Sequence, residues 1–167
     1  ERPVTRGTAE NPETFFTHRE SVNEYYDTVP EVVEHYLGEI SKITGREYHL
    51  FSYYGADDAE RIIILMGSAT EAAREAIDYL NKNGEKVGMI SVHLYRPFSV
   101  KHLLASVPKT VKRIAVLDRT KEPGAEGEPL YLDVKSAYYD VENRPLIVGG
   151  RYGLGSNDTT PAVIISV

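Results

Sequence analysis

The sequence contains no cysteine among its 167 residues. This excludes disulfide bonds, thiol chemistry and any zinc or iron–sulfur site ligated by cysteines of this chain. It also has no apolar run approaching the roughly 20 residues of a membrane-spanning helix. No secretory signal is recognisable at the start of the sequence. We therefore expect a cytoplasmic domain.

An excess of positive charge is missing as well, because 25 Asp and Glu residues outnumber 19 Lys and Arg residues. Proteins that bind nucleic acids or anionic membranes generally present a basic face. Neither is expected as a partner of a chain with a net charge of −6. With 41% hydrophobic residues, the chain is long enough to bury the core of one domain.

From residue 48 onward, short apolar runs alternate with helical patterns. The continuous apolar runs are typical of strands that are covered on both faces. Such alternation with short loops predicts a mainly parallel sheet with helices on both sides. Strands are expected at 48–54, 61–66, 87–94, 113–117 and 145–148, and helices at 68–83, 100–107 and 129–139.

The N-terminal 28 residues are polar but carry four aromatic side chains, at Phe15, Phe16, Tyr25 and Tyr26. We expect residues 1–28 to form an extended inter-domain arm that packs either on its own domain or on a missing neighbour. A helix is expected to start at Thr28, with Glu31 in capping-box spacing, and to end at Gly45.

The remaining residues, 29–167, are expected to form one α/β domain. Thr160 and Pro161 have the pattern of a helix start close to the last residue. We therefore expect the last helix to be truncated and the chain to be part of a longer polypeptide. A trimmed or processed terminus is the alternative.

In an open parallel sheet, ligands bind outside the carboxyl ends of the strands. The run Gly149-Gly150-Arg151 combines flexible glycines with one arginine at such a strand end, and is a weak candidate site for an anion such as a phosphate of coenzyme A. It does not match the dinucleotide-binding fingerprint. Gly67-Ser68 also opens a helix, but an ordinary helix start explains it as well.

Asp118 follows a buried strand and opens a long charged loop. It could act as an acid or base only if a second polar group faced it. The plainer interpretation is that it caps locally or pairs with Arg119 or Lys121. The five histidines lack metal-ligand spacing, and no serine lies in a Gly-x-Ser-x-Gly elbow.

Several long strings, spread in order over nearly the whole chain, resemble pyruvate:ferredoxin (flavodoxin) oxidoreductases. In this sequence they are RGTAENP at 6–12, TGREY at 44–48, YYGA at 53–56, MGS at 66–68, LYRPF at 94–98, LDRTKEPG at 117–124, GEPLYLDV at 127–134 and GGRYGL at 149–154.

The resemblance places the chain in domain II of that family, which is similar to the C-terminal domain of transketolase. It implies a three-layer α/β/α sandwich with a five-stranded mixed sheet in the order 1-3-2-4-5 and strand 1 antiparallel. It also implies a homodimeric parent enzyme that converts pyruvate and coenzyme A to acetyl-CoA and CO2, and that passes electrons to ferredoxin or flavodoxin.

The resemblance further implies thiamine diphosphate, Mg2+ and [4Fe-4S] clusters in the parent, held by other domains. No catalytic, cofactor-binding or metal-binding residue transfers to this chain, which we expect to be a non-catalytic, inter-domain element. A coenzyme A or phosphate-binding module and an independent α/β protein-interaction domain are the alternatives. The candidate contacts with other domains are Arg6, Asn11, Arg96, Asp118, Arg119, Arg151 and Tyr152.

Overall fold

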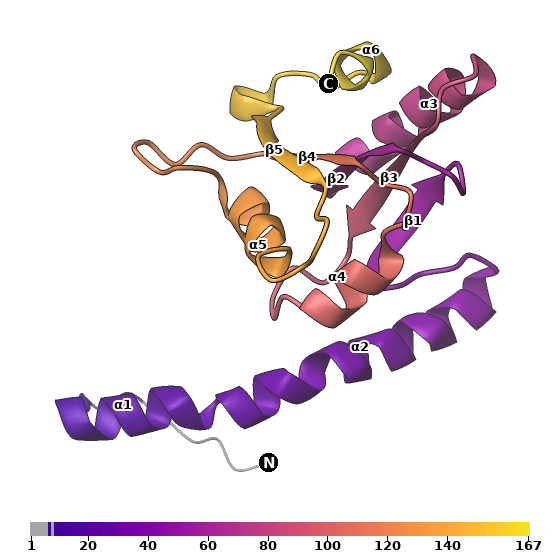
Figure 1. Cartoon of the computed structure of the whole chain (residues 1–167). Helices are drawn as coiled ribbons and strands as arrows, with labels where there is room; N and C mark the ends of the chain where they lie inside the picture. The colour runs from indigo at the N-terminus through magenta and orange to yellow at the C-terminus, as the bar shows by residue number, and fades with distance from the viewer. Residues whose placement is uncertain (1–6, 8) are drawn as a thin grey trace.

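The computed structural model describes residue 7 and residues 9–167. Two N-terminal helices precede an α/β body in which strands and helices alternate (Figure 1). The helices are α1 Pro12–Ser21, α2 Asn23–Thr44, α3 Ala69–Lys82, α4 Val100–Ser106, α5 Pro129–Ala137 and α6 Pro161–Ile165, with a 3-10 turn at Leu154–Ser156. The strands are β1 Phe51–Gly55, β2 Arg61–Met66, β3 Val87–Val92, β4 Arg113–Asp118 and β5 Leu146–Arg151.

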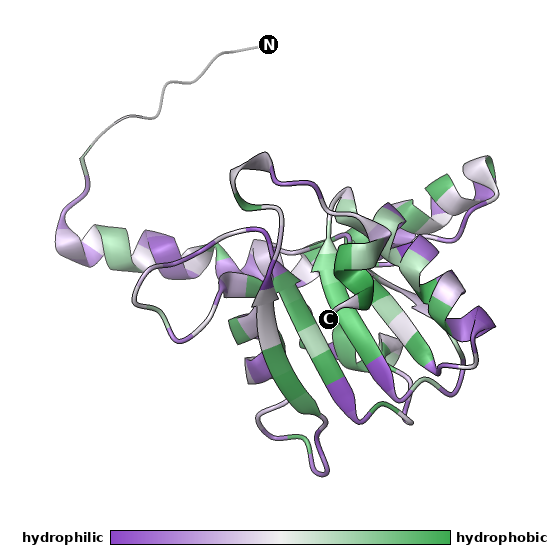
Figure 2. Ribbon diagram, turned by 90° about the horizontal axis from the view of Figure 1, so that it is seen from above, coloured by the Kyte–Doolittle hydropathy of each residue, from purple (hydrophilic) through white to green (hydrophobic). Residues whose placement is uncertain are grey.

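The strands form one five-stranded sheet in the order β1-β3-β2-β4-β5. β1 pairs antiparallel with β3, and all other neighbouring strands run parallel. This arrangement confirms the predicted mixed sheet. The apolar runs explain the centre of the sheet, because four consecutive residues of β2, from Ile62 to Leu65, are buried. Figure 2 shows the same pattern as green strands that turn purple at one end.

Successive side chains along each strand point to opposite faces of the sheet, and they form one hydrophobic core on each face. On one face, Ile64, Ile90 and Val116 pack with α4 and α5. On the other, Leu65 and Met89 pack with the alanine-rich side of α3 and with Ile164 of α6. The three predicted layers are therefore present (Figure 1).

Residues 12–28 are helical, so the expectation of an extended arm is wrong for this part of the chain. Pro12 lies at the start of α1, where its missing N–H costs nothing. No glycine or proline interrupts the chain between Pro12 and Pro30, so the helical conformation continues through the expected arm. The expected arm residues up to Arg6, and Thr8, lie outside the described residues.

The expected caps were correct at some helix ends and wrong at others. Gly45 ends α2 in a left-handed conformation, and its N–H donates to the carbonyl of Ser41. Thr28 does not cap a helix, because it lies inside α2 and its hydroxyl donates to the carbonyl of Tyr25. Ser68 makes no side-chain cap bond to α3, since its own backbone is already helical. The Thr160 hydroxyl accepts from the N–H of Val163 at the start of α6.

Candidate functional site

The carboxyl ends of β2, β3, β4 and β5 meet at one edge of the sheet, because these strands are parallel. The loops that leave this edge enclose a cavity of about 220 Å³, which we call the carboxyl-edge cavity. It is lined by Met66, Tyr95, Leu117, Asp118, Arg119, Thr120 and Pro129.

Five of the predicted contact residues come together around this edge. Arg96 follows β3, Asp118 and Arg119 follow one another at the end of β4, and Arg151 and Tyr152 follow one another at the end of β5. Asn11 does not join them, because it lies at the start of α1, away from the sheet (Figure 1). Arg6 lies outside the described residues.

Asp118 is the buried last residue of β4, and its carboxylate caps helix α5 across the loop. One oxygen accepts from the N–H of Leu130 at 3.0 Å and the other from the N–H of Tyr131 at 3.1 Å. Burial raises the pKa of Asp118 above its usual value, and these two hydrogen bonds offset only part of that rise. The charges of Glu128 and Asp133 raise the pKa further. Both oxygens are therefore occupied by the first turn of α5.

This capping gives a first prediction on stability. Replacing Asp118 with Ala should lower the free energy of unfolding by about 1–2 kcal/mol, because two N–H groups of α5 lose their acceptor. Asp118→Asn should cost less, since its amide oxygen can still accept one of the two bonds. Urea denaturation of both variants measures the difference. Equal stability of the Ala variant and the unchanged chain would contradict the capping role.

Glu128 is a site residue that the sequence reasoning missed. Its side chain is only 4% exposed, and it lies 2.7 Å from the Arg151 guanidinium and 3.4 Å from the Lys121 ammonium. Burial alone would raise the pKa of Glu128, but the hydrogen bonds from Arg151, Lys121 and the Glu122 N–H leave it below the usual value. Its position between Gly127 and Pro129, at a helix start, was the one local signal in the sequence.

The candidate anion site at Gly149, Gly150 and Arg151 has another structural explanation. A Cβ on Gly149 would lie 2.9 Å from the Tyr131 ring, and one on Gly150 would lie 2.8 Å from a methyl group of Leu117. Close packing therefore accounts for both glycines, and Arg151 is paired with Glu128. These contacts do not favour a phosphate of coenzyme A at this strand end.

Arg96, Tyr152 and Arg119 also make polar contacts within the domain. The Arg96 guanidinium lies 2.7 Å from a carboxylate oxygen of Asp133 and stacks over the Tyr95 ring. The Tyr152 hydroxyl donates to the carbonyl of Met66 at 2.9 Å, and burial raises the pKa of Tyr152. Arg119 donates through Nε to the carbonyl of Gly153 at 3.2 Å.

Burial also raises the pKa of Tyr95 to about 12, with the Asp133 carboxylate adding to the rise. Tyr95 therefore stays protonated at neutral pH, and each carboxylate oxygen of Asp118 already accepts one backbone N–H of α5. Within residues 9–167, no three His, Asp or Glu side chains gather in a group able to hold a metal ion. The edge is a tightly bonded corner of the fold rather than an open set of reactive groups.

Comparison with known proteins gives the family. The model for "Pyruvate:ferredoxin oxidoreductase core domain II" matches residues 59–164. The whole chain is 60% identical to the pyruvate-flavodoxin oxidoreductase of Enterobacter agglomerans and 52% identical to the pyruvate:ferredoxin oxidoreductase of Moorella thermoacetica. In both cases this chain spans only 14% of the relative's length.

A solved structure of a 2-oxoglutarate:ferredoxin oxidoreductase from Magnetococcus marinus, with 2-oxoglutarate, coenzyme A and succinyl-CoA bound, is similar in fold. The match extends over 95% of this chain and 23% of the chain in the solved structure, with a TM-score of 0.51 and a sequence identity of 20%. The match at 59–164, together with the sheet order, leads to one conclusion. The chain belongs to the core domain II family of pyruvate:ferredoxin oxidoreductases.

Proposed function

We propose that this chain serves as a structural, inter-domain element of a larger pyruvate:ferredoxin (flavodoxin) oxidoreductase. That enzyme would convert pyruvate and coenzyme A to acetyl-CoA and CO2 and pass the released electrons to ferredoxin or flavodoxin. The similarity over the full chain to a relative about seven times longer carries this proposal, since this chain spans 14% of that relative.

The carboxyl-edge geometry supports a structural role. Asp118 and Glu128 are the two buried acids at this edge, and each is held by groups of the same domain. A general acid or base must be free to exchange a proton with the substrate. Here Asp118 bonds to the start of α5 and Glu128 to Arg151 and Lys121, which supports a structural role, and we place the chemistry in other domains.

The cofactors that the family resemblance implies do not fit the described residues. Thiamine diphosphate is held through Mg2+, which takes oxygen ligands, and iron–sulfur clusters need cysteine thiolates. The chain has no cysteine, and the part that the structure describes offers no metal-binding group. We propose that other domains of the parent hold these cofactors, and no reaction step is assigned to this chain.

The same proposal includes the contacts of this chain with other domains, the dimeric state of the parent enzyme and its location in the cell. We propose contacts with other domains of the parent through Asn11, Arg96, Arg119 and Tyr152, and a homodimeric parent in the cytoplasm. None of the helices in the described part of the chain combines the length and apolarity needed to cross a bilayer.

An activity assay on the full-length oxidoreductase that contains this sequence tests the structural role. Asp118→Asn should change the rate of dye reduction with pyruvate and coenzyme A by less than about threefold, like the control Asp140→Asn on the surface. Loss of a true general acid or base costs about 100-fold or more. A loss of that size with an unchanged melting temperature would contradict the proposal.

A second measurement separates the alternatives. The 167-residue chain on its own should reduce no dye with pyruvate and coenzyme A. Turnover by this chain would overturn the proposal directly. Calorimetric titration with coenzyme A should release no heat of binding, and saturable binding would instead favour the coenzyme A-binding module.

A further inference from the structure

Helix α2 carries a second apolar side that the domain does not use. Residues at spacings of three and four positions lie on one side of an α-helix. In α2 this spacing connects six apolar or aromatic residues, which we call the outer stripe. They are Tyr25, Val29, Val32, Tyr36, Ile40 and Ile43.

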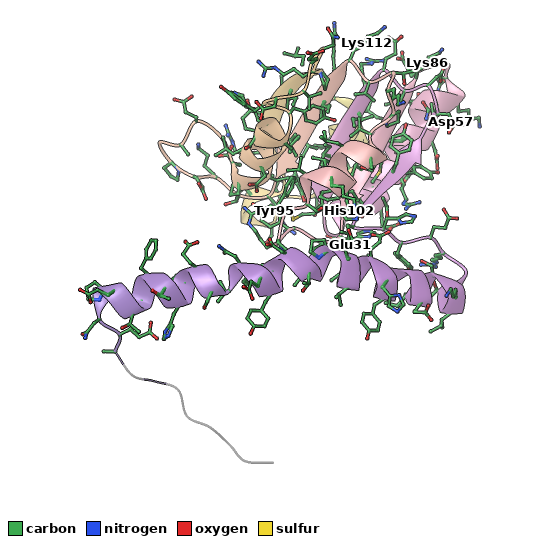
Figure 3. The ribbon with its side chains drawn as sticks, turned by 60° about the horizontal axis from the view of Figure 1, so that its bottom comes forward. Glu31, Asp57, Lys86, Tyr95, His102 and Lys112 are labelled. Carbon is green, nitrogen blue, oxygen red and sulfur yellow. The ribbon has the colours of Figure 1, made fainter. Side chains whose placement is uncertain are left out.

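The opposite side of α2 is the one that contacts the body. Val33 and Leu37 pack against the hydrophobic core, and the Glu34 carboxylate accepts from the backbone N–H of Leu50 at 2.9 Å. Glu31 pairs with Lys101 of α4 at 2.8 Å, and Figure 3 shows it on the side of α2 that faces His102. These contacts fix the orientation of α2, so the outer stripe points away from the body.

Five of the six residues of the outer stripe are exposed, and Val29 is half-buried. Ile43 is 84% exposed, Tyr25 74% and Tyr36 61%. In helix α1, Phe15 is 54% exposed and Phe16 69%, and none of the α1 residues is buried. A stripe along a helix about 33 Å long forms a contiguous patch, and patches of this kind mark interaction surfaces.

The charge of the two helices argues against a second copy of this chain as the partner. Residues 12–44 contain seven Asp and Glu residues but only two Lys and Arg residues. Two such helices packed side by side would place like charges along both rims of the interface, which disfavours association. A complementary partner would be apolar at its centre and basic at its rim.

We propose that the outer stripe of α2 docks against another domain of the same oxidoreductase polypeptide, on an apolar surface rimmed by Lys or Arg side chains. This inference rests on the proposed function. The relatives are long enough to contain such a partner domain, because 86% of the length of the Enterobacter agglomerans enzyme lies outside the matched 14%. It adds a docking surface on α2 to the contacts proposed above through Asn11, Arg96, Arg119 and Tyr152.

Covalent labelling of tyrosine side chains tests the docking directly. Hydroxyl-radical footprinting would be applied to the full-length oxidoreductase and to the 167-residue chain alone. Tyr25 and Tyr36 should be labelled about tenfold more slowly in the full-length enzyme, since the centre of an interface excludes water. Equal labelling in both samples would overturn the proposal.

A matched pair of double variants adds specificity. Tyr36→Ser with Ile43→Ser removes two side chains of the outer stripe without changing the net charge. Glu39→Ser with Lys42→Ser removes an exposed ion pair from the same turns, also without changing the net charge. In the full-length enzyme, only the first pair should restore labelling of Tyr25 to the rate seen in the chain alone. Restored labelling in the second pair, or in neither, would contradict the docking.

Two further observations complete the test. Circular dichroism of the 167-residue chain should be the same for both double variants, because all four side chains are exposed there. Slow labelling of the chain alone that becomes fast on dilution would identify a second copy as the occupant and overturn the proposal. Labelling reports a surface and not a reaction, so its result stands apart from the activity assay of the proposed function.

Discussion

Gly55→Ala should lower the free energy of unfolding by about 3–5 kcal/mol, from backbone strain together with overpacking. Gly55 ends β1 with a φ of +138°, a conformation that is essentially restricted to glycine. An added Cβ would also lie 2.6 Å from the carbonyl oxygen of Val87 and would collide with Gly88 on β3. Because Gly55 and Gly88 are paired in the sheet register, the clash cannot be relieved without separating the two strands.

Gly45→Ala is the matched control. Gly45 also has a positive φ, of 69°, but a Cβ there would meet no atom within 4 Å. Its substitution should cost only the strain of the left-handed conformation, about 1–2 kcal/mol. Urea denaturation of the two variants measures both values. If they were equally destabilised, the close approach of β1 and β3 would not be the cause.

Arg151→Met should strongly destabilise the chain, and more than Lys121→Met does. Glu128 is buried while the Arg151 side chain is 45% exposed, and removing Arg151 leaves the buried carboxylate without its nearer compensating charge. Arg151 is the nearer partner of the buried Glu128 carboxylate, at 2.7 Å against 3.4 Å for Lys121. Thermal unfolding at neutral pH compares the variants. If Lys121→Met were the more destabilising of the two, Glu128 would not depend on Arg151.

The ion pair between Glu128 and Arg151 also determines how the stability difference between the unchanged chain and Arg151→Met depends on pH. The pKa of Glu128 in the folded chain lies below its ordinary value of 4.5. A carboxyl group of this kind contributes stability above its unfolded pKa, and the contribution is lost as pH falls through the folded pKa. The gap between the unchanged chain and Arg151→Met should therefore be full at neutral pH and should close below about pH 4.5. A gap that persisted in acid would show that Arg151 acts through packing instead.

The centre of the fold could be predicted from the sequence because its signals are local. The run from Ile62 to Leu65 and the alanine-spaced side of α3 determine, within a few residues, which element forms and which face it buries. The order of the strands came from the family resemblance, since nothing local specifies it. These elements agree with the structure apart from their ends.

The N-terminal helices were harder to predict. Helix α1 has no apolar stripe and no buried residue, so periodicity gave no signal for it. The apolar residues of α2 from Val29 to Ile43 follow one helical period in the sequence, which by itself predicts a single packed face. The structure divides these residues between two sides, since Val33 and Leu37 contact the body while Tyr36 and Ile40 do not.

The site residues show a similar limit. Asp118 was singled out for its place at a strand end, and the helix that it caps begins 11 residues later, at Pro129. Glu128 was missed because its partner Arg151 is 23 positions away in the sequence. A pair at that separation leaves no pattern in a single sequence, and only the fold brings the two residues together.

The loop between β4 and α5 is fastened at its base by the two buried acids. Asp118 holds the start of α5, and Glu128 accepts from the N–H of Glu122 as well as from Arg151. The tip, at 123–126, is exposed, and a Cβ on Gly124 would meet nothing. Additional residues, such as a tag, a probe or a small folded module, could therefore be inserted at this tip while the sheet and α5 keep their positions.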